Sequence, residues 1–193
     1  SGSDETVLIE NRHGRCRIPL RADGQPAAWH GFDLMRTAGE IHAIIRPHLG
    51  QKVAAIDVVG LGAGVYDRLR EQQLSVEPFD AGAAPLPDGR SERFANRRAQ
   101  VFWQLRDELR RGRLDLDPGD DDLASQLLSL RYYVDSRGRI CLESKDDMRA
   151  RGLPSPDRAD ALAMSLAPPV QPEETVLATD TPGLTDDLMT REW

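Results

Sequence analysis

The chain has 193 residues and a mass of 21.4 kDa, enough for one substantial domain but not for two large ones. Its residues are 39% hydrophobic and 30% charged, so it can bury a core, and no stretch approaches the roughly 20 apolar residues of a membrane-spanning helix. This composition excludes a protein built on membrane helices. The formal net charge of −7 would argue against nucleic-acid binding if the charges were spread evenly, and they are not.

Several kinds of site are also excluded. Cys16 and Cys141 are the only cysteines and fit neither a disulfide framework nor a zinc site, which favours a reducing compartment. The spacing of the four histidines does not suggest a catalytic site. No Gly-x-Ser-x-Gly pattern and no Cys-His pairing occurs, which argues against a covalent nucleophile. The chain opens on Ser without a basic and apolar leader, from which we expect that an upstream region is missing.

In chain order, the first half predicts a hairpin, a helix and a crossover unit. Short apolar runs at 6–12 and 15–20 meet near a His-Gly turn, and apolar residues at helical spacing follow over 32–49. A continuous β-branched run at 52–59, a helix at 65–72 and a strand at 74–79 complete this half. Strand, helix and strand in this order favour a sheet with parallel members.

The second half predicts four helical segments and one more hairpin. These are helices at 91–111, 123–130, 145–151 and 157–166, and strands at 131–134 and 139–142. From residue 168 to 193 six acids face one base, which is typical of a disordered acidic tail. The expected organisation is therefore one α/β domain over 1–167 and an acidic tail over 168–193.

Asp57 is the one ionisable residue inside the apolar strand at 52–59. A carboxylate among Val, Ile and Ala is costly unless it is solvated at the strand end, paired or bound to a cation. Sheets of this class bind ligands beyond the carboxyl ends of their strands, where Asp57 would lie. A functional role and a carboxylate held by the amides of the next turn are both open.

Gly60, Gly62 and Gly64 follow that strand directly. The turn lacks the dinucleotide-binding spacing because Val65 stands where a glycine is needed, and no Gly-Lys-Ser/Thr follows for a phosphate-binding loop. A tight turn from strand to helix is therefore favoured over a nucleotide cradle.

Asp157 and Asp160 form a second acidic site, three residues apart on one face of the last predicted helix. As acids in the first helical turn they would each add about 0.3–1 kcal/mol through the helix dipole. Together with Asp57 they have a second interpretation. Two carboxylate sites on separate elements, both at element ends, form the pattern that collects a divalent metal ion.

Arginines are concentrated between residues 90 and 113, where eight of them face three acids for a local net charge of +5. The planar guanidinium suits phosphate oxygens and is always charged. Contact with a phosphate backbone and pairing with the acids at 117–122 are both open. The candidates for DNA contact are Arg90, Arg93, Arg97, Arg98, Arg106 and Arg110.

Three stretches together resemble the nuclease domain of a tailed-phage terminase large subunit. They are residues 56–69, residues 94–100, and residues 145–152 with 155–162. Each motif is modest alone, but their order and spacing are specific, and the likeness covers most of residues 1–167. The resemblance implies a ribonuclease-H-like mixed sheet flanked by helices, in which acids on two strands and a C-terminal helix hold two divalent ions, Mg²⁺ or Mn²⁺.

The resemblance also implies roles for individual residues. Asp57 matches the acid that ends the strand before the glycine turn, and Asp157 matches the acid that opens the last helix, so these two are the expected catalytic residues and metal ligands. Asp160 is a further metal candidate as the neighbour of Asp157. The first metal acid of the family ends an earlier strand, which we expect this chain to lack, and Asp4 is the candidate for an auxiliary ligand.

The activity implied is that of a metal-dependent endonuclease that hydrolyses concatemeric double-stranded DNA during phage genome packaging in the host cytoplasm. Its implied partners are an upstream ATPase domain, the portal and the terminase small subunit. With the first strand missing, we expect weak cleavage or none from this chain. Two alternatives stay open: a non-catalytic module that docks on DNA or the portal, and another ribonuclease-H-like nuclease such as a Holliday-junction resolvase.

Overall fold

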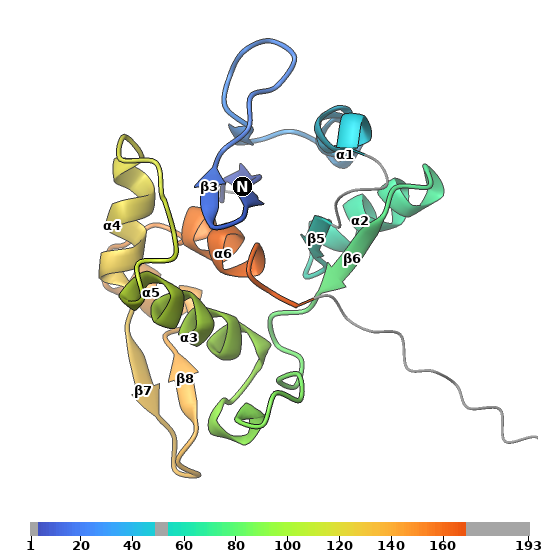
Figure 1. Cartoon of the computed structure of the whole chain (residues 1–193). Helices are drawn as coiled ribbons and strands as arrows, with labels where there is room; N and C mark the ends of the chain where they lie inside the picture. The colour runs from blue at the N-terminus through green and yellow to red at the C-terminus, as the bar shows by residue number, and fades with distance from the viewer. Residues whose placement is uncertain (1–3, 49–53, 169–193) are drawn as a thin grey trace, which may run out of the picture.

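The computed structural model of the chain describes residues 4–48 and 54–168 (Figure 1). The predicted acidic tail from residue 169 onward and the first residues of the predicted strand 52–59 lie outside this part. The strands are β1 (Thr6–Val7), β2 (Glu10–Arg12), β3 (Arg15–Arg17), β4 (Ala28–Trp29), β5 (Ala54–Asp57), β6 (Val76–Phe79), β7 (Tyr132–Val134) and β8 (Ile140–Leu142). The α-helices are α1 (Leu34–Ile45), α2 (Leu61–Glu71), α3 (Arg97–Arg110), α4 (Asp121–Ser129), α5 (Lys145–Ala150) and α6 (Asp157–Met164), with short 3₁₀ turns η1 (Arg46–His48) and η2 (Ser91–Arg93).

One half of the molecule is the predicted strand–helix–strand unit covered by α1. β5 and β6 pair in parallel, and α2 connects them, as the sequence pattern predicts. The apolar stripes of α1 and α2 face each other and bury Ala38, Ile41, Val65 and Leu69. Ala54 and Ile56 of β5 pack on this core, which fixes the position of Asp57 at the end of the strand.

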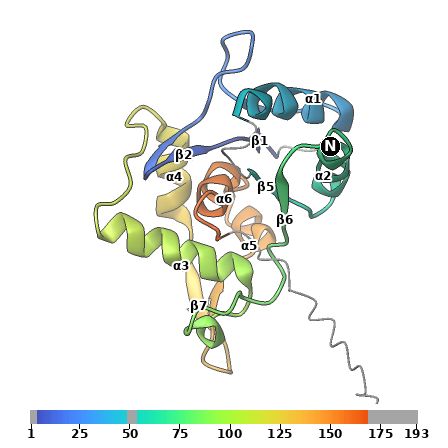
Figure 2. The same ribbon diagram turned by 45° about the vertical axis from the view of Figure 1, so that its right-hand side comes forward.

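The other half is built around α6, which lies between α3, α4 and the N-terminal strands (Figure 2). Its Ala159 and Leu162 are fully buried and pack with Leu105 of α3 and Leu123 of α4. The β7–β8 hairpin extends from this half, and α5 leads from it back to α6 (Figure 1). No helix in residues 4–48 and 54–168 is long and apolar enough to cross a membrane.

Strand pairing differs from the expected single mixed sheet, because the described strands form four separate two-stranded ladders. The predicted first hairpin is confirmed only in part. β2 and β3 pair across the His-Gly turn, but β1 pairs antiparallel with β4, a strand that the sequence analysis did not predict. The reason is tertiary: buried Trp29 on β4 belongs to the α1–α2 core, and the Leu8 amide bonds to the Ala27 carbonyl at 2.9 Å.

Two helix boundaries also differ from the prediction. α2 begins at Leu61 inside the glycine turn rather than at residue 65, since glycines there allow the helix to start against the strand end. The predicted helix 91–111 is divided into η2 and α3. Asn96 marks the division, because its side chain accepts a hydrogen bond from the Ala99 amide and caps α3.

Arg158 links three parts of the chain through one guanidinium. Its Nε and Nη2 donate to both carboxylate oxygens of Glu5 at 2.9 and 3.1 Å, and its Nη1 donates to Asp120 at 2.6 Å. Asp122 adds a longer ion pair at 3.3 Å. The N-terminal segment, the start of α4 and the first turn of α6 are therefore fixed to one another by charge.

We expect Arg158→Met to lower the free energy of unfolding by about 3–5 kcal/mol, because it leaves the mostly buried carboxylates of Glu5 and Asp120 without their cation. Urea denaturation followed by circular dichroism measures the loss. The matched control is Arg113→Met, whose solvent-screened pair with Glu108 should contribute much less to stability. Equal losses in the two variants would contradict the assignment of Arg158 as a structural link.

Candidate active site

Asp57 ends β5 and faces the glycine turn. Its Oδ1 accepts a hydrogen bond from the Val59 amide at 3.0 Å. A Cβ on Gly62 would come within 1.8 Å of the Asp57 carbonyl oxygen, so only glycine lets α2 start this close to the strand end. A Cβ on Gly64 would meet Leu34 of α1 at 2.2 Å. Two of the three glycines thus serve close packing, in agreement with a tight strand-to-helix turn.

Asp157 and Asp160 both lie in the first turn of α6, but their side chains have different partners. Asp157 accepts three hydrogen bonds: its Oδ2 from the Glu5 amide at 2.7 Å, and its Oδ1 from Ser155 Oγ at 2.6 Å and Lys145 Nζ at 3.0 Å. Asp160 Oδ1 accepts from Arg98 Nε at 2.9 Å. Asp157 is thus engaged by the N-terminal segment, whereas Asp160 turns towards α3.

Lys145 is a site residue that sequence reasoning missed. A capping box between Ser144 and Asp147 starts α5 and makes Lys145 its first residue. The ammonium then lies 3.0 Å from Asp157 Oδ1 and 3.4 Å from Asp160 Oδ2. The available signal was the lone lysine next to a capping box, shortly before the two acids, but nothing local shows that these segments meet.

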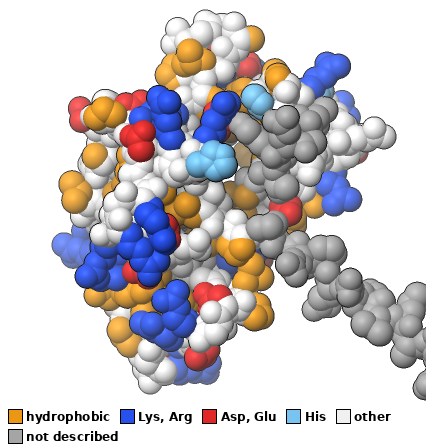
Figure 3. Space-filling view, viewed as in Figure 1, with side chains coloured by type: hydrophobic (Ala, Val, Ile, Leu, Met, Phe, Trp, Pro, Cys, Tyr) orange, Lys and Arg blue, Asp and Glu red, His pale blue; other side chains and the backbone are white. Residues whose placement is uncertain are grey.

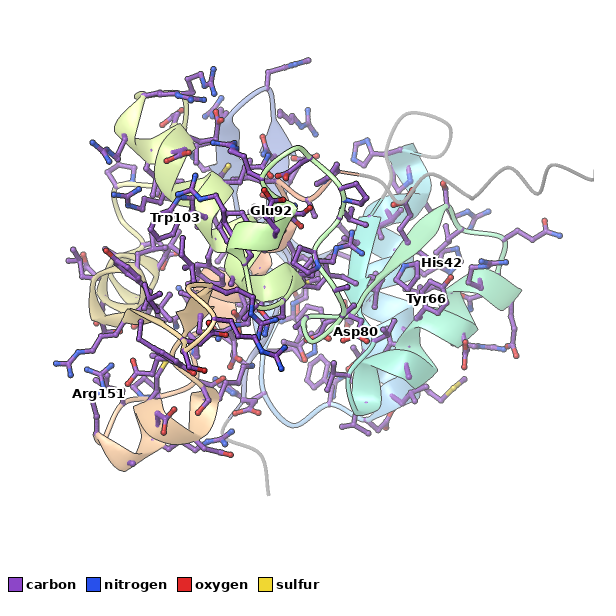
Figure 4. All side chains as sticks on the ribbon, turned by 90° about the horizontal axis from the view of Figure 1, so that it is seen from below. His42, Tyr66, Asp80, Glu92, Trp103 and Arg151 are labelled. Atoms are coloured by element: carbon purple, nitrogen blue, oxygen red, sulfur yellow. The ribbon has the colours of Figure 1, made fainter. Side chains whose placement is uncertain are left out.

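A small pocket joins β5 to α6 and α3. Among the residues that line it are Asp57, Asp160, Lys145 and Arg98, with apolar walls from Phe79 and Phe102. Asp80 follows β6 at the junction between the two halves of the molecule (Figure 4). The structure therefore brings together Asp57 and Asp160, two of the predicted metal ligands. Asp157 is connected to this pair through Lys145 and does not line the pocket.

The charges in the pocket alter the acidity of its groups. Desolvation against the pocket wall raises the pKa of Asp57, and the negative charges of Asp160 and Asp80 add to it, while the Val59 amide and Lys145 act in the opposite direction. Burial by itself lowers the pKa of Lys145, but the attraction of Asp160 and Asp157 outweighs it and the pKa is raised. The ammonium is therefore a permanent cation at neutral pH.

Asp4 lies apart from this pocket. Its carboxylate is half exposed and lies 3.6 Å from Arg149 on α5. Its backbone carbonyl faces His30 Nδ1 at 3.2 Å. The following residue, Glu5, contacts Asp157, so Asp4 is near the first turn of α6 along the chain, but its side chain is directed to another helix.

The six candidate arginines fall into two groups. Arg90, Arg93 and Arg110 are exposed, and the guanidinium of Arg106 lies over the Trp103 ring at 4.5 Å with the side chain 42% exposed. The other two are directed inward, which corrects the expectation of one arginine surface. Arg97 is buried with its guanidinium over Phe79, and Arg98 lies in the pocket against Asp160. The part of α3 that carries Arg97 and Arg98 packs on α6 and on Phe79 of β6.

The donor set in the pocket suits a hard divalent cation. Carboxylate oxygens are the ligands that Mg²⁺ prefers, and Mg²⁺ is often held by only one or two carboxylates together with water and phosphate oxygens. Asp57 and Asp160 supply two such groups. Within the part of the chain that the structure describes, no group of three or more His, Cys, Asp or Glu side chains could hold a metal ion.

Solved structures with the same fold come from two phages. The nuclease domain of the large terminase subunit gp2 of bacterial virus Sf6, with manganese and beta-thujaplicinol, is 20% identical with a TM-score of 0.72, over 88% of this chain and 84% of that one. Another structure of that domain is 20% identical with a TM-score of 0.66, over 86% and 87% of the two chains. The large terminase nuclease from thermophilic phage G20c with bound magnesium is 16% identical with a TM-score of 0.53, over 85% and 82%.

At these identities the likeness establishes the fold. The chain has the ribonuclease-H-like fold of terminase nuclease domains, so the resemblance and the fold class predicted from the sequence are confirmed. No family model matches the chain, and neither does any curated protein sequence.

The raised pKa of Asp57 leads to a test of its environment. The native fold favours the protonated carboxyl, so ionised Asp57 lowers stability above its native pKa, and this effect disappears as the pH falls to the ordinary value of about 3.9. In EDTA at pH 7, Asp57→Asn should therefore melt at a higher temperature than the wild type, and the difference should shrink at pH 4. Thermal unfolding with Asp67→Asn on the exposed face of α2 as the control checks this. A lower melting temperature of Asp57→Asn at pH 7 would contradict it.

Proposed function

We propose that this chain is the nuclease domain of a phage terminase large subunit, and that it cuts concatemeric double-stranded DNA during genome packaging. The observation that carries the proposal is the convergence of Asp57 and Asp160 from β5 and α6 on one pocket beside Lys145. The fold supports it, because nuclease domains of two phage terminases share this fold over most of the chain. The reaction is hydrolysis of phosphodiester bonds by an endodeoxyribonuclease.

The proposed cofactor is a pair of divalent ions, Mg²⁺ or Mn²⁺. Related structures were solved with manganese, magnesium or cobalt, which supports a divalent ion for this chain. Asp57 and Asp160 would hold such ions, and Asp157 and Asp4 are the further ligands that the sequence predicts. Bound at such a site, the ions activate water and stabilise the leaving oxygen of the phosphodiester.

The protein groups have separate parts in this proposal. Asp57 and Asp160 offer oxygens to the pocket from β5 and α6, and Phe79 and Phe102 give it apolar lining. Lys145 neutralises the acids of α6 in the absence of metal and must give up its contact with Asp160 when an ion is bound. With two carboxylates in the pocket, we expect this chain alone to cleave weakly.

DNA is proposed to lie along the exposed arginines of α3 and the segment before it. Figure 3 shows basic side chains gathered on the face that carries α3 and the β7–β8 hairpin. Arg90, Arg93, Arg106 and Arg110 are the candidates that remain accessible to a phosphate backbone. The proposed partners in the packaging motor are an ATPase domain, the portal and the small subunit, in the host cytoplasm.

A plasmid-nicking assay tests the proposed function. With Mn²⁺, the wild-type chain or a form extended upstream should convert supercoiled plasmid to nicked circles, and Asp57→Asn and Asp160→Asn should each reduce the rate at least 100-fold. Asp67→Asn, which removes an exposed acid outside the pocket, should cleave at the wild-type rate. Full activity in either pocket variant would exclude the assignment. DNA retention without any metal-dependent cleavage would favour the docking alternative.

Lys145 leads to a second test. We expect Lys145→Met to bind Mn²⁺ about tenfold more tightly than the wild type, because the ammonium no longer competes for the oxygens of Asp157 and Asp160. Isothermal titration calorimetry measures the affinity. The matched control is Arg68→Met, whose acidic partner Glu71 is exposed on α2 and lies outside the pocket. Weaker binding by Lys145→Met would show that the lysine supports the ion rather than competing with it.

A further inference from the structure

We infer that Arg98 is a positioning residue of this site, which fixes the carboxylate of Asp160 beside Asp57 and directs one of its oxygens into the pocket. The inference rests on the proposed function and goes beyond it, since Arg98 was expected on the DNA-contacting surface. It follows from how the two oxygens of Asp160 are divided between two cations.

The guanidinium of Arg98 is held on three sides. Its Nε donates to Asp160 Oδ1 at 2.9 Å, and its Nη1 donates to the carbonyl oxygen of Glu143 at 2.9 Å. Its plane lies over the ring of Phe102, with the central carbon 5.2 Å from the ring centroid. The side chain is only 13% exposed. A planar group with three such anchors has one orientation and imposes it on the carboxylate it contacts.

The second anchor is itself immobilised. The carboxylate of Glu143 accepts from Arg151 Nε at 2.7 Å and from Nη2 at 2.6 Å, and the same Nη2 donates to the Ser129 carbonyl at 2.9 Å. The Glu143 amide donates to the Arg131 carbonyl. These bonds connect the end of β8, the end of α4 and the end of α5. Because Arg98 is bonded to Glu143, its contact with Asp160 is fixed to the same structure.

The two oxygens of Asp160 have cations of different mobility. Oδ1 accepts the hydrogen bond from Arg98 at 2.9 Å, whereas Oδ2 faces Lys145 at the longer distance of 3.4 Å. Lys145 is 37% exposed and has a flexible stem, so its contact can be exchanged. The division leaves Oδ2 as the oxygen that a divalent ion can take over, while Oδ1 keeps the carboxylate in place.

Stability alone does not account for Arg98. Replacing a buried ion pair by apolar groups is often neutral or stabilising, and Arg98 has one further cost. Its Nη2 is buried and has no hydrogen-bond partner in the described part of the chain, which lowers the stability of the fold. A residue that served only for packing would not need a positive charge. An arginine that orients a functional carboxylate does need it.

The test compares two Arg→Lys variants of the full chain. Lysine keeps the charge but cannot contact Asp160 and the Glu143 carbonyl together, so Arg98→Lys should bind Mn²⁺ 10- to 100-fold more weakly in calorimetry. Arg139→Lys is the matched control, because Arg139 also donates through Nε to an aspartate, Asp135, at 2.9 Å but outside the pocket. It should bind Mn²⁺ as the wild type does. Affinity of folded Arg98→Lys within twofold of the wild type would overturn the inference.

A measurement on the wild-type protein covers the case in which Arg98→Lys does not fold. In NMR spectra, the Nε–H signal of Arg98 should stay protected and unshifted during titration with Mg²⁺, while the Lys145 ammonium signal should change. Loss of the Arg98 signal on titration would overturn the inference.

The outcomes also separate this inference from the proposed function. If the wild type binds Mn²⁺ and Asp160→Asn abolishes binding, but Arg98→Lys has no effect, only the role of Arg98 fails. If neither the wild type nor any variant binds Mn²⁺, the nuclease proposal fails and Arg98 has no ion to position.

Discussion

The arrangement of α6, β5 and α5 depends on balancing the negative charge where they meet. Asp57, Asp157 and Asp160 bring three carboxylates to this junction, and like charges this close oppose folding unless cations accompany them. The chain supplies two. Lys145 lies between the two acids of α6, and Arg98 holds Asp160 from the side of α3. These two residues make the cluster of acids compatible with folding before any ion is bound.

Each charged group reaches the junction through a simple local device. The glycine turn lets α2 start against the carbonyl of Asp57, the capping box at Ser144 sets the start of α5, and the cap at Asn96 sets the start of α3. The strand end at Asp57, the tight glycine turn and the parallel β5–β6 pair were predicted from the sequence, whereas the caps at Asn96 and Ser144 were not. The order of helices and the acids of α6 could therefore be predicted from local pattern alone.

What could not be predicted is which side chains meet. The pair of Arg98 with Asp160 joins residues 62 positions apart, and the bond from the Glu5 amide to Asp157 spans 152 positions. No periodicity encodes such pairs. For the same reason Arg97 and Arg98 were named as candidates for DNA contact, although α3 turns both of them inward. The composition gives the number of charged residues in a segment, but the fold determines which of them are exposed to solvent.

The two acids of α6 illustrate how position within one helical turn divides roles. Three residues advance a helix by about 4.5 Å, so Asp157 and Asp160 share a face but lie at different positions along the helix axis. Asp157, at the first helical position, is reached by the Glu5 amide, Ser155 and Lys145, and it ties β1 to the helix. Of these three partners, Lys145 is the one that an ion could replace. Asp160 lies nearly one turn further along α6, and its partners are the cations Arg98 and Lys145. Because a cation can be exchanged for a metal ion and a backbone amide cannot, Asp160 is the better placed of the two to act on a substrate.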